Sequence, residues 1–386
     1  MILLGVYMYD LQRYSEGKYN LFLLILTLLI IISGLAYRLG GDGLHYLLEY
    51  NTYSIQDGFG WEALNKYKDR QPGWVFLIKI CRTITEDYTL FKMIHALIVN
   101  ILIAKAIKKY SSYLFSGLLL YFVLMYFDFN FQILRQSLAI AVYLSAIPYF
   151  EKKQWLKYYL ISTVAFSFHT SALICFVFPF IKIIGYNKKA LLLYLLLMLL
   201  FIINVDEVLI ILLNSYTLSE ETAHIDFYAQ QVELGLGFSF FINLMLSVIV
   251  PFYFIYLFSK RSMIDKIYPK QYIIIAYAFI YTVGLYVPIL YRFNHYFILF
   301  LYLFYIDIFN YIARYSYTKF KFGALKLRVG VYFIVLILTF TTIKARFYFS
   351  PYGDTPYPTW VQYYPYSSVI FKSKDNLRED FFKYIN

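Results

Sequence analysis

Charged residues are scarce in this chain of 386 residues: Asp, Glu, Lys and Arg make up 15% of it, whereas hydrophobic residues make up 61%. That composition excludes an intrinsically disordered chain, and the many apolar segments of spanning length exclude a soluble globular domain. Cysteine is nearly absent, and Cys81 and Cys175 form no CxxC motif and no disulfide framework. We therefore predict an all-α, polytopic integral membrane protein, a single domain over residues 1–386 with about 10–12 transmembrane or re-entrant helices.

Several signatures of cofactor chemistry are also missing. The five histidines never fall at HxxxH or HxxH spacing, so we expect no metal site. The sequence contains no GxGxxG, P-loop or GxSxG element, and we expect no cofactor. Residues 1–9 are short and carry no basic leader of a cleaved signal peptide, and two readings stay open for them: a truncated first helix or a start codon assigned too late. The net charge of +12 does not indicate nucleic acid, because the basic residues cluster in short loops between apolar segments.

The apolar segments predict a membrane topology. The loop 206–237 carries six acidic residues and no Lys or Arg, so it is expected outside, whereas the basic loops are expected in the cytoplasm. Residues 155–184 form a segment that is too long for one span. The basic residues on both sides of it are cytoplasmic only if the segment enters the membrane and returns, as a broken hairpin around His169. Residues 37–87 and the tail 346–386 then also lie outside. The predicted spans are Tyr19–Ala36, Tyr88–Ala106, Ser111–Phe127, Phe131–Phe150, Ala190–Val205, Phe238–Phe258, Gln271–Leu290, Phe293–Ile312 and Val329–Ile343.

The first polar motif follows the first span directly. Arg38, Asp42, His45 and Tyr46 lie within ten residues that also contain three glycines. Glycine lets the backbone fold closely around a neighbour, and a charged segment at the mouth of a span lies where bilayer meets water. We expect this motif to form one wall of an external site, with Asp42 as a candidate base.

Three further polar groups lie in otherwise apolar surroundings. Arg135, with Gln136 beside it, stands just inside a predicted span, where a guanidinium costs energy unless it faces a polar cavity. His169 is the second candidate base, and a core histidine bonded to a hydroxyl is the alternative. Tyr291 and Arg292 begin a predicted outward corner between two spans, residues 291–296, and an ordinary interfacial anchor is the alternative for Arg292. The 44 tyrosines suit a sugar-binding groove, although a biased genome composition gives the same count.

The order of these motifs resembles the EpsG family, which is similar to Wzy-type O-antigen and exopolysaccharide polymerases. The motifs are RxGGDxxxY (38–46), PGW (72–74), RQSLA (135–139), FHTSA (168–172) and YRF (291–293). One departure is Gln71, since such proteins often carry an acidic residue before the Pro-Gly.

The resemblance implies a GT-C-like or Wzy-like helical bundle in the bacterial cytoplasmic membrane with an outward-facing active site. It implies a metal-independent glycosyltransferase that joins undecaprenyl-diphosphate-linked oligosaccharide units, with membrane lipid around it and a chain-length regulator as a candidate partner. Asp42 or His169 would then be catalytic. The residues that would bind diphosphate or substrate are Arg38, Arg135, Arg292, Tyr46, Gln136 and Tyr291.

Three other activities fit the same residues. A flippase for lipid-linked oligosaccharides would need polar residues along the full membrane depth, and internal repeats are absent here. A glycan ligase needs the same diphosphate handling as a polymerase and stays open. An O-acyltransferase would place its site toward a cytoplasmic acyl donor, on the opposite side from His169.

Overall fold

Long runs of Leu, Ile and Phe bury their apolar side chains most economically as helices, which also satisfy their own backbone hydrogen bonds. The computed structural model describes residues 1–67, 70–203, 238–261, 269–285, 288–320 and 355–385. Within these ranges all regular secondary structure is helical, apart from one isolated antiparallel bridge between Ala36 and Ser368. The all-α prediction is therefore confirmed for the described residues. The predicted span Val329–Ile343 and the acidic loop 206–237 lie outside them.

Two described helices are long and apolar enough to cross a membrane, namely α6 (Tyr88–Tyr110) and the continuous segment Phe241–Lys260. Several shorter helices are apolar too, among them α2 (Lys18–Gly34) and α7 (Leu114–Leu124). This arrangement is that of an apolar helical bundle, as a membrane protein requires. The number of spans stays a prediction.

Some predicted spans are interrupted in the structure. The segment predicted as Phe131–Phe150 is divided between α8 (Leu134–Leu144) and α9 (Ile147–Glu151). Pro148, near the start of α9, has no N–H to continue the earlier helix, which explains the break. Hydropathy alone does not register such breaks, because the residues around them remain apolar.

The described chain forms two compact units. The first comprises residues 1–148, 155–170 and 309–386, and the second comprises residues 149–154 and 171–308. The prediction of a single integral domain stays a prediction.

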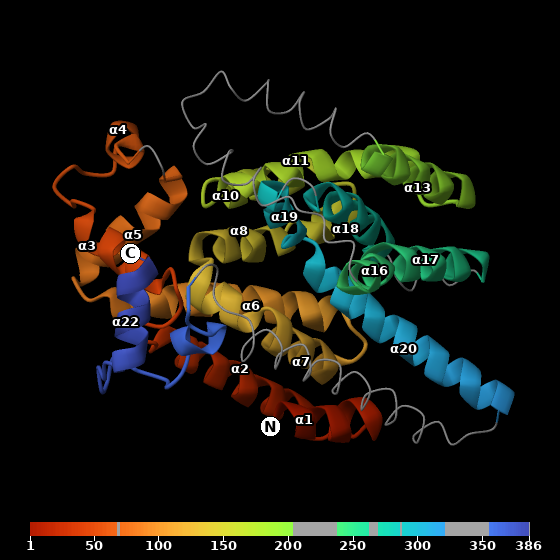
Figure 1. Cartoon of the computed structure of the whole chain (residues 1–386), viewed down its shortest axis with the longest axis horizontal. Coiled ribbons are helices and arrows are strands. Elements are labelled where there is room, and N and C mark those ends of the chain that lie inside the picture. Colours follow the sequence, from red (N-terminus) through yellow and green to blue (C-terminus); the bar gives the residue numbers. More distant parts are fainter. Residues whose placement is uncertain (68–69, 204–237, 262–268, 286–287, 321–354, 386) are drawn as a thin grey trace. The chain divides into compact units, whose positions relative to one another are not determined.

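The first unit is built around α6, which packs against α2 and α8 (Figure 1). A polar triad lies inside it. The Asn100 side chain donates to Asn130 Oδ1 at 2.8 Å and accepts from the Tyr121 hydroxyl at 2.8 Å. The Asn130 amide in turn donates to Tyr121 at 3.1 Å. All three residues are buried, and the closed ring of hydrogen bonds removes the cost of burying them. The other elements of this core are α1 (Ile2–Gly5), the π-helical turns η1 (Val6–Leu11) and η2 (Asp128–Gln132), and α10 (Trp155–Phe166).

Residues 37–87, predicted as an external loop, fold into three helices of the first unit: α3 (Gly43–Thr52), α4 (Trp61–Asn65) and α5 (Pro72–Ile84). Side chains tie these helices together. The Tyr50 hydroxyl donates to Thr85 O at 2.8 Å, and the buried Lys79 ammonium donates to Gly58 O at 2.9 Å. The described residues of this segment therefore pack as part of the unit.

The C-terminal segment (355–385) of the first unit carries η8 (Thr359–Gln362) and α22 (Asn376–Ile385). It returns to the end of α2, where Tyr37 N donates to Ser367 O at 2.9 Å and Val369 N donates to Leu35 O at 2.9 Å. A small apolar cluster of Val361, Phe381 and Phe382, joined by Leu44, holds α22 against η8 and α3.

The second unit is likewise helical. Lys270, at the start of α18 (Lys270–Gly284), forms an ion pair with Asp307 of α20 (Ile298–Phe320). The elements of this unit are η3 (Thr170–Leu173), α11 (Ile174–Val177), η4 (Phe178–Phe180), α12 (Ile181–Ile184), α13 (Lys188–Ile203), α16 (Phe238–Leu244), η5 (Met245–Ile249), α17 (Val250–Lys260), α18 (Lys270–Gly284), α19 (Pro288–Asn294) and the first part of α20 (Ile298–Phe320).

Candidate functional site

The glycines of the first motif press the backbone of residues 38–43 against η2. Gly40 has φ +85°, and a Cβ at this position would lie 2.1 Å from Phe131 O. Only glycine combines that left-handed conformation with so close an approach. The sequence predicted that the backbone approaches a neighbour closely here. The structure shows that this neighbour is the backbone of Phe131, four residues before Arg135.

The same loop is held from its other side by the C-terminal segment. Gly40 N donates to Gln362 O at 2.9 Å, and Gly41 N donates to Gln362 Oε1 at 2.7 Å. The Gln132 amide also donates to Gln362 Oε1, at 2.7 Å. Gln362 thus joins the glycine loop to η2, and the loop has little freedom to move.

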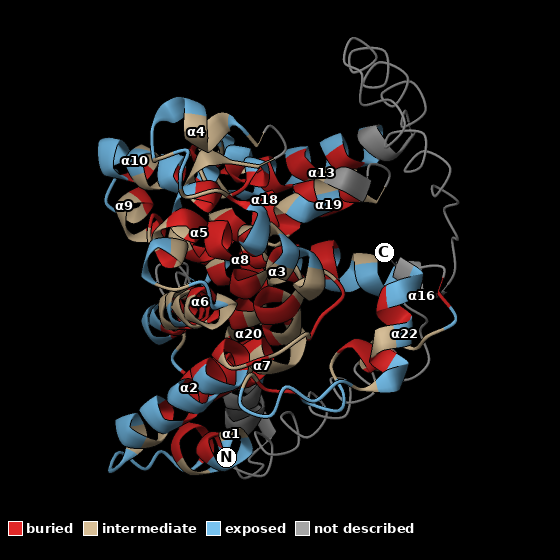
Figure 2. Ribbon diagram, turned by 90° about the vertical axis from the view of Figure 1, so that its left-hand side faces the viewer, coloured by how far each residue is buried: buried red, intermediate tan, exposed pale blue. Residues whose placement is uncertain are grey.

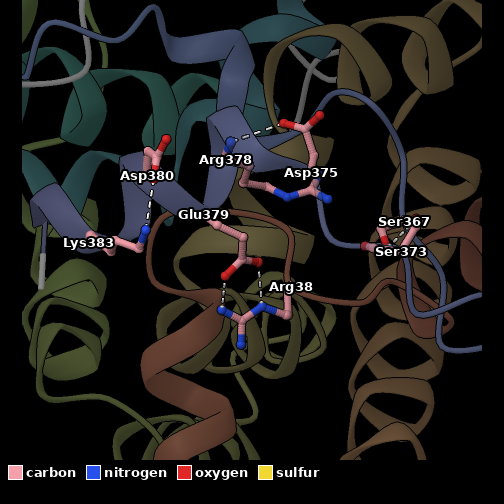
Figure 3. A network of polar contacts seen from close by, with 8 residues as sticks. All are labelled: Arg38, Ser367, Ser373, Asp375, Arg378, Glu379, Asp380 and Lys383. Carbon is pink, nitrogen blue, oxygen red and sulfur yellow. Dashed lines mark hydrogen bonds and ion pairs between the residues drawn. The ribbon is translucent and has the colours of Figure 1, made fainter.

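Arg38 makes a two-point ion pair with Glu379 of α22 (Figure 3). Its Nε donates to Oε1 at 2.8 Å and its Nη2 donates to Oε2 at 2.6 Å. The two side chains are only 16% and 22% exposed, so water screens the pair weakly. The guanidinium also lies 5.7 Å from the centre of the Phe382 ring. The structure therefore gives the predicted diphosphate ligand Arg38 a resident carboxylate partner.

Asp42, Tyr46 and Arg135 come together in the first unit. Burial, together with the nearby carboxylate of Asp42, raises the pKa of the Tyr46 hydroxyl to about 12. The charge of Arg135 and its hydrogen bond with the Tyr46 hydroxyl act in the opposite direction. At neutral pH Tyr46 is therefore a neutral hydroxyl that lies close to both a carboxylate and a guanidinium. Three predicted site residues from two separate motifs thus form one cluster.

Glu49 extends this cluster and was not predicted as a site residue from the sequence. Its Oε1 accepts from Arg70 Nε at 2.6 Å, and its Oε2 accepts from Trp74 Nε1 at 3.0 Å. Arg70 and Glu49 form an ion pair. The available signal for Glu49 was helical spacing, because Tyr46 and Glu49 share one face of α3.

The Pro-Gly-Trp motif joins this cluster to the segment that carries His169. Gly73 N donates to Ser167 O at 2.8 Å, and a Cβ on Gly73 would lie 2.3 Å from Ser167 Oγ. Trp74 is fully buried, with its ring centre 5.4 Å from that of Tyr46. The start of α5 thus lies against the turn that follows α10.

His169 lies where the broken hairpin was predicted to break. The helix α10 ends at Phe166, a turn follows, and η3 begins at Thr170. The His169 backbone N–H donates to Ala165 O at 3.3 Å, and the side chain is largely buried. The predicted interruption of the helix at this histidine is confirmed. A direct relation between His169 and Asp42 stays a prediction.

Gln136 is buried on α8 beside Ser137, whose hydroxyl donates to Phe129 O at 2.7 Å. Arg135 precedes them and is half-buried. Among the residues that the structure describes, Arg135 Nε has no hydrogen-bond partner although it is buried. An unsatisfied charged donor of this kind is costly unless a ligand or solvent engages it.

Arg292 and Tyr291 belong to the second unit, so the predicted convergence of Arg292 with Arg38 and Arg135 stays a prediction. The corner predicted over 291–296 overlaps the turn in the structure, which lies at 295–297. Tyr291 and Arg292 themselves lie within the preceding helix α19. Pro288 explains this, because a proline at the first position favours a helix start and hydropathy does not show it. Both side chains are exposed on this helix.

No group of three or more His, Cys, Asp or Glu residues in the described part of the chain has an arrangement that could hold a metal ion. The described site instead offers hydroxyls, carboxylates and guanidinium groups. Such a set can bind an anionic substrate and receive a proton.

Comparison with known proteins gives one match. The model of the EpsG family matches residues 19–368, which is most of the chain and includes every motif described above. No curated protein and no solved structure matches the chain.

Proposed function

Since this chain belongs to the EpsG family, we propose that it is a polysaccharide polymerase of the bacterial cytoplasmic membrane. Membership of the family points to a polymerase-like glycosyltransferase acting on a lipid-linked saccharide in the membrane. The finer proposal is that it joins undecaprenyl-diphosphate-linked repeat units on the outer face of that membrane. A chain-length regulator is a candidate partner in the same proposal.

The observation that carries the proposal is the cluster of Asp42, Tyr46 and Arg135. Arg135 has a hydrogen bond with Tyr46 and an Nε donor that the described protein leaves without a partner. A guanidinium with spare donors is the side chain best suited to a phosphate oxygen. Arg135 is therefore assigned the main contact with the leaving diphosphate.

Arg38 is assigned a second contact. Glu379 occupies its Nε and Nη2, so the remaining Nη1 group is the part that would reach the diphosphate. Arg292 is proposed as a third contact, and Tyr291 and Gln136 as substrate-binding residues.

The reaction is a direct displacement. A hydroxyl oxygen of the incoming repeat unit attacks the anomeric carbon of the donor glycan, and a new glycosidic bond forms. The bond from that carbon to the diphosphate oxygen breaks, and its electron pair stays on the diphosphate, where the arginines stabilise the charge. The hydroxyl proton passes to Asp42 or to His169. Displacement in one step inverts the anomeric centre.

The test uses purified protein in lipid vesicles with lipid-linked repeat units, and it measures the ladder of longer glycans. Arg135→Ala and His169→Ala should each lower the rate at least tenfold. Lys66→Ala is the matched control, since this exposed residue of the 37–87 segment pairs only with Asp57 among the described residues. If both site variants polymerise at the wild-type rate, the site assignment is wrong. Transport of the lipid without new glycosidic bonds would identify a flippase, and transfer of a single unit to another acceptor would identify a ligase.

A further inference from the structure

The loop between η8 and α22, residues 364–374, exposes large apolar side chains. Ile370 is 69% exposed and Phe371 is 83% exposed, and Tyr364 and Tyr366 beside them are exposed as well. Single exposed apolar residues are ordinary, whereas a cluster of them within one short loop marks a surface that meets another apolar phase. We call residues 364–374 the interfacial loop.

The position of this loop is fixed by the end of α2. The Tyr366 hydroxyl donates to Ile32 O at 2.9 Å, and Ser368 forms the bridge with Ala36. Tyr366 therefore lies within hydrogen-bond reach of the last turn of an apolar helix.

The same helix presents an exposed apolar face, visible in Figure 2 as pale blue positions along α2 between buried ones. In a membrane protein such a face meets lipid. Its exposed residues are Leu23, Leu24, Leu28, Ile31 and Ile32. The interfacial loop thus continues this face at the level where α2 ends.

The polar residues of the loop fit the same level. Lys372 directly follows Phe371, Lys374 comes two residues later, and both lysines are exposed. Tyrosine is enriched where hydrocarbon gives way to headgroups, and lysine there is attracted to anionic phosphates. The Ser367 hydroxyl donates to Ser373 O at 2.6 Å, which closes the loop (Figure 3). Ile370 and Phe371 lie between these two serines and are exposed.

We propose that the interfacial loop is a membrane anchor that inserts Ile370 and Phe371 into the leaflet at the C-terminal end of α2. The occupant of this surface is the phospholipid bilayer. A protein partner is disfavoured because the apolar tip continues a lipid-facing helix and is followed by lysines suited to headgroups. The anchor also fixes the start of α22 relative to the bilayer surface, and it thereby keeps Glu379 beside Arg38.

The test places a nitroxide spin label in the full-length protein in vesicles of phosphatidylethanolamine and phosphatidylglycerol. The labelled variants are Phe371→Cys at the tip, Leu24→Cys as the bilayer reference and Lys383→Cys as the water reference. Cys81 and Cys175 are fully buried, so labelling is directed to the introduced thiol. Substitution at so exposed a residue as Phe371 leaves the packing intact. Collision rates with oxygen, which concentrates in the bilayer, and with a nickel chelate, which stays in water, are measured at each label.

The ratio of oxygen to nickel collisions at residue 371 should approach that at residue 24 and exceed that at residue 383 at least threefold. A ratio at residue 371 equal to that at residue 383 places the loop in water and overturns the proposal. Shielding from both reagents overturns it too, because it shows that protein covers the loop. None of these readouts depends on glycosyl transfer, so the proposal and the proposed function fail independently.

Discussion

Gly40→Ala should destabilise the protein more than any other glycine substitution at a positive φ in the first unit. Two costs add at this position. Forcing an alanine into the left-handed region at φ +85° costs about 1–2 kcal/mol. The added Cβ would also lie 2.1 Å from Phe131 O, a backbone atom of η2 that cannot rotate away. Overpacking of that kind costs about 1–3 kcal/mol more.

Gly58→Ala is the matched control for this experiment. Gly58 has φ +73°, close to that of Gly40, but a Cβ there would meet no atom within 4 Å. It should therefore show the conformational cost alone, about 1–2 kcal/mol. The difference in free energy of unfolding between the two variants isolates the cost of the contact with Phe131, and we expect this difference to be about 1–3 kcal/mol.

The assay is thermal unfolding of each variant in detergent, followed by size-exclusion chromatography of the protein that stays folded. Gly40→Ala should lose its folded peak several degrees below Gly58→Ala, which should itself lie slightly below the wild type. Equal midpoints for the two variants would refute the close packing of the glycine loop on η2.

Three further predictions concern charged residues. Glu379→Gln should destabilise α22 by about 1–3 kcal/mol because it leaves the half-buried guanidinium of Arg38 without its counter-ion. Asp380→Asn on the same helix breaks only an exposed pair and should leave the stability of α22 almost unchanged. Hydrogen exchange of α22 measures both, and equal protection in the two variants would contradict the pairing. Glu49→Gln should leave expression intact, because the amide oxygen can still accept one hydrogen bond. It should lower the rate of polymerisation, because the neutral amide cannot pair with the charge of Arg70. An unchanged rate would limit Glu49 to a structural role. Asp87 caps α6, and hydrogen bonds from Thr89 lower the pKa of its carboxyl group. The ionised cap therefore contributes to folding stability above about pH 4, and this stability is lost as the pH falls through the lowered pKa. In Asp87→Asn the midpoint temperature should therefore change less between pH 7 and pH 3 than in the wild type, and equal pH dependence would exclude this cap as its source.

Local patterns predicted much of the first unit. The polar residues inside an otherwise apolar segment indicated the helix break at His169, and the structure places the break there. The glycines of residues 40–43 predicted a close backbone approach, which Phe131 confirms. Both features are encoded by neighbours in the sequence, since a histidine with hydroxyls disfavours an unbroken apolar helix and glycine adopts φ above zero without steric cost.

Features that depend on distant residues escaped prediction. Nothing near Arg38 indicates that its partner is Glu379, which lies 341 residues away. The polar residues at 291–296 indicate a corner, but they do not fix at which of them α19 ends. Glu49 was missed because an acid in an external segment is usually solvated, and its burial follows only from the packing of α3 against Trp74. Which distant residues pair with one another is set by tertiary packing, and composition and periodicity carry no information about it.

The pairing of Arg38 with Glu379 also sets an order of events during biosynthesis. At roughly 5–20 residues per second, a ribosome that has made Arg38 needs roughly 20–70 s to reach its partner 341 residues later. Until then the glycine loop lacks both Glu379 and Gln362, so this wall of the site is completed only after the last helix has been synthesised. We expect chains truncated before residue 355 to insert their first helices and yet remain inactive. The late closure would keep an unfinished enzyme from engaging lipid-linked glycans while it is still attached to the ribosome.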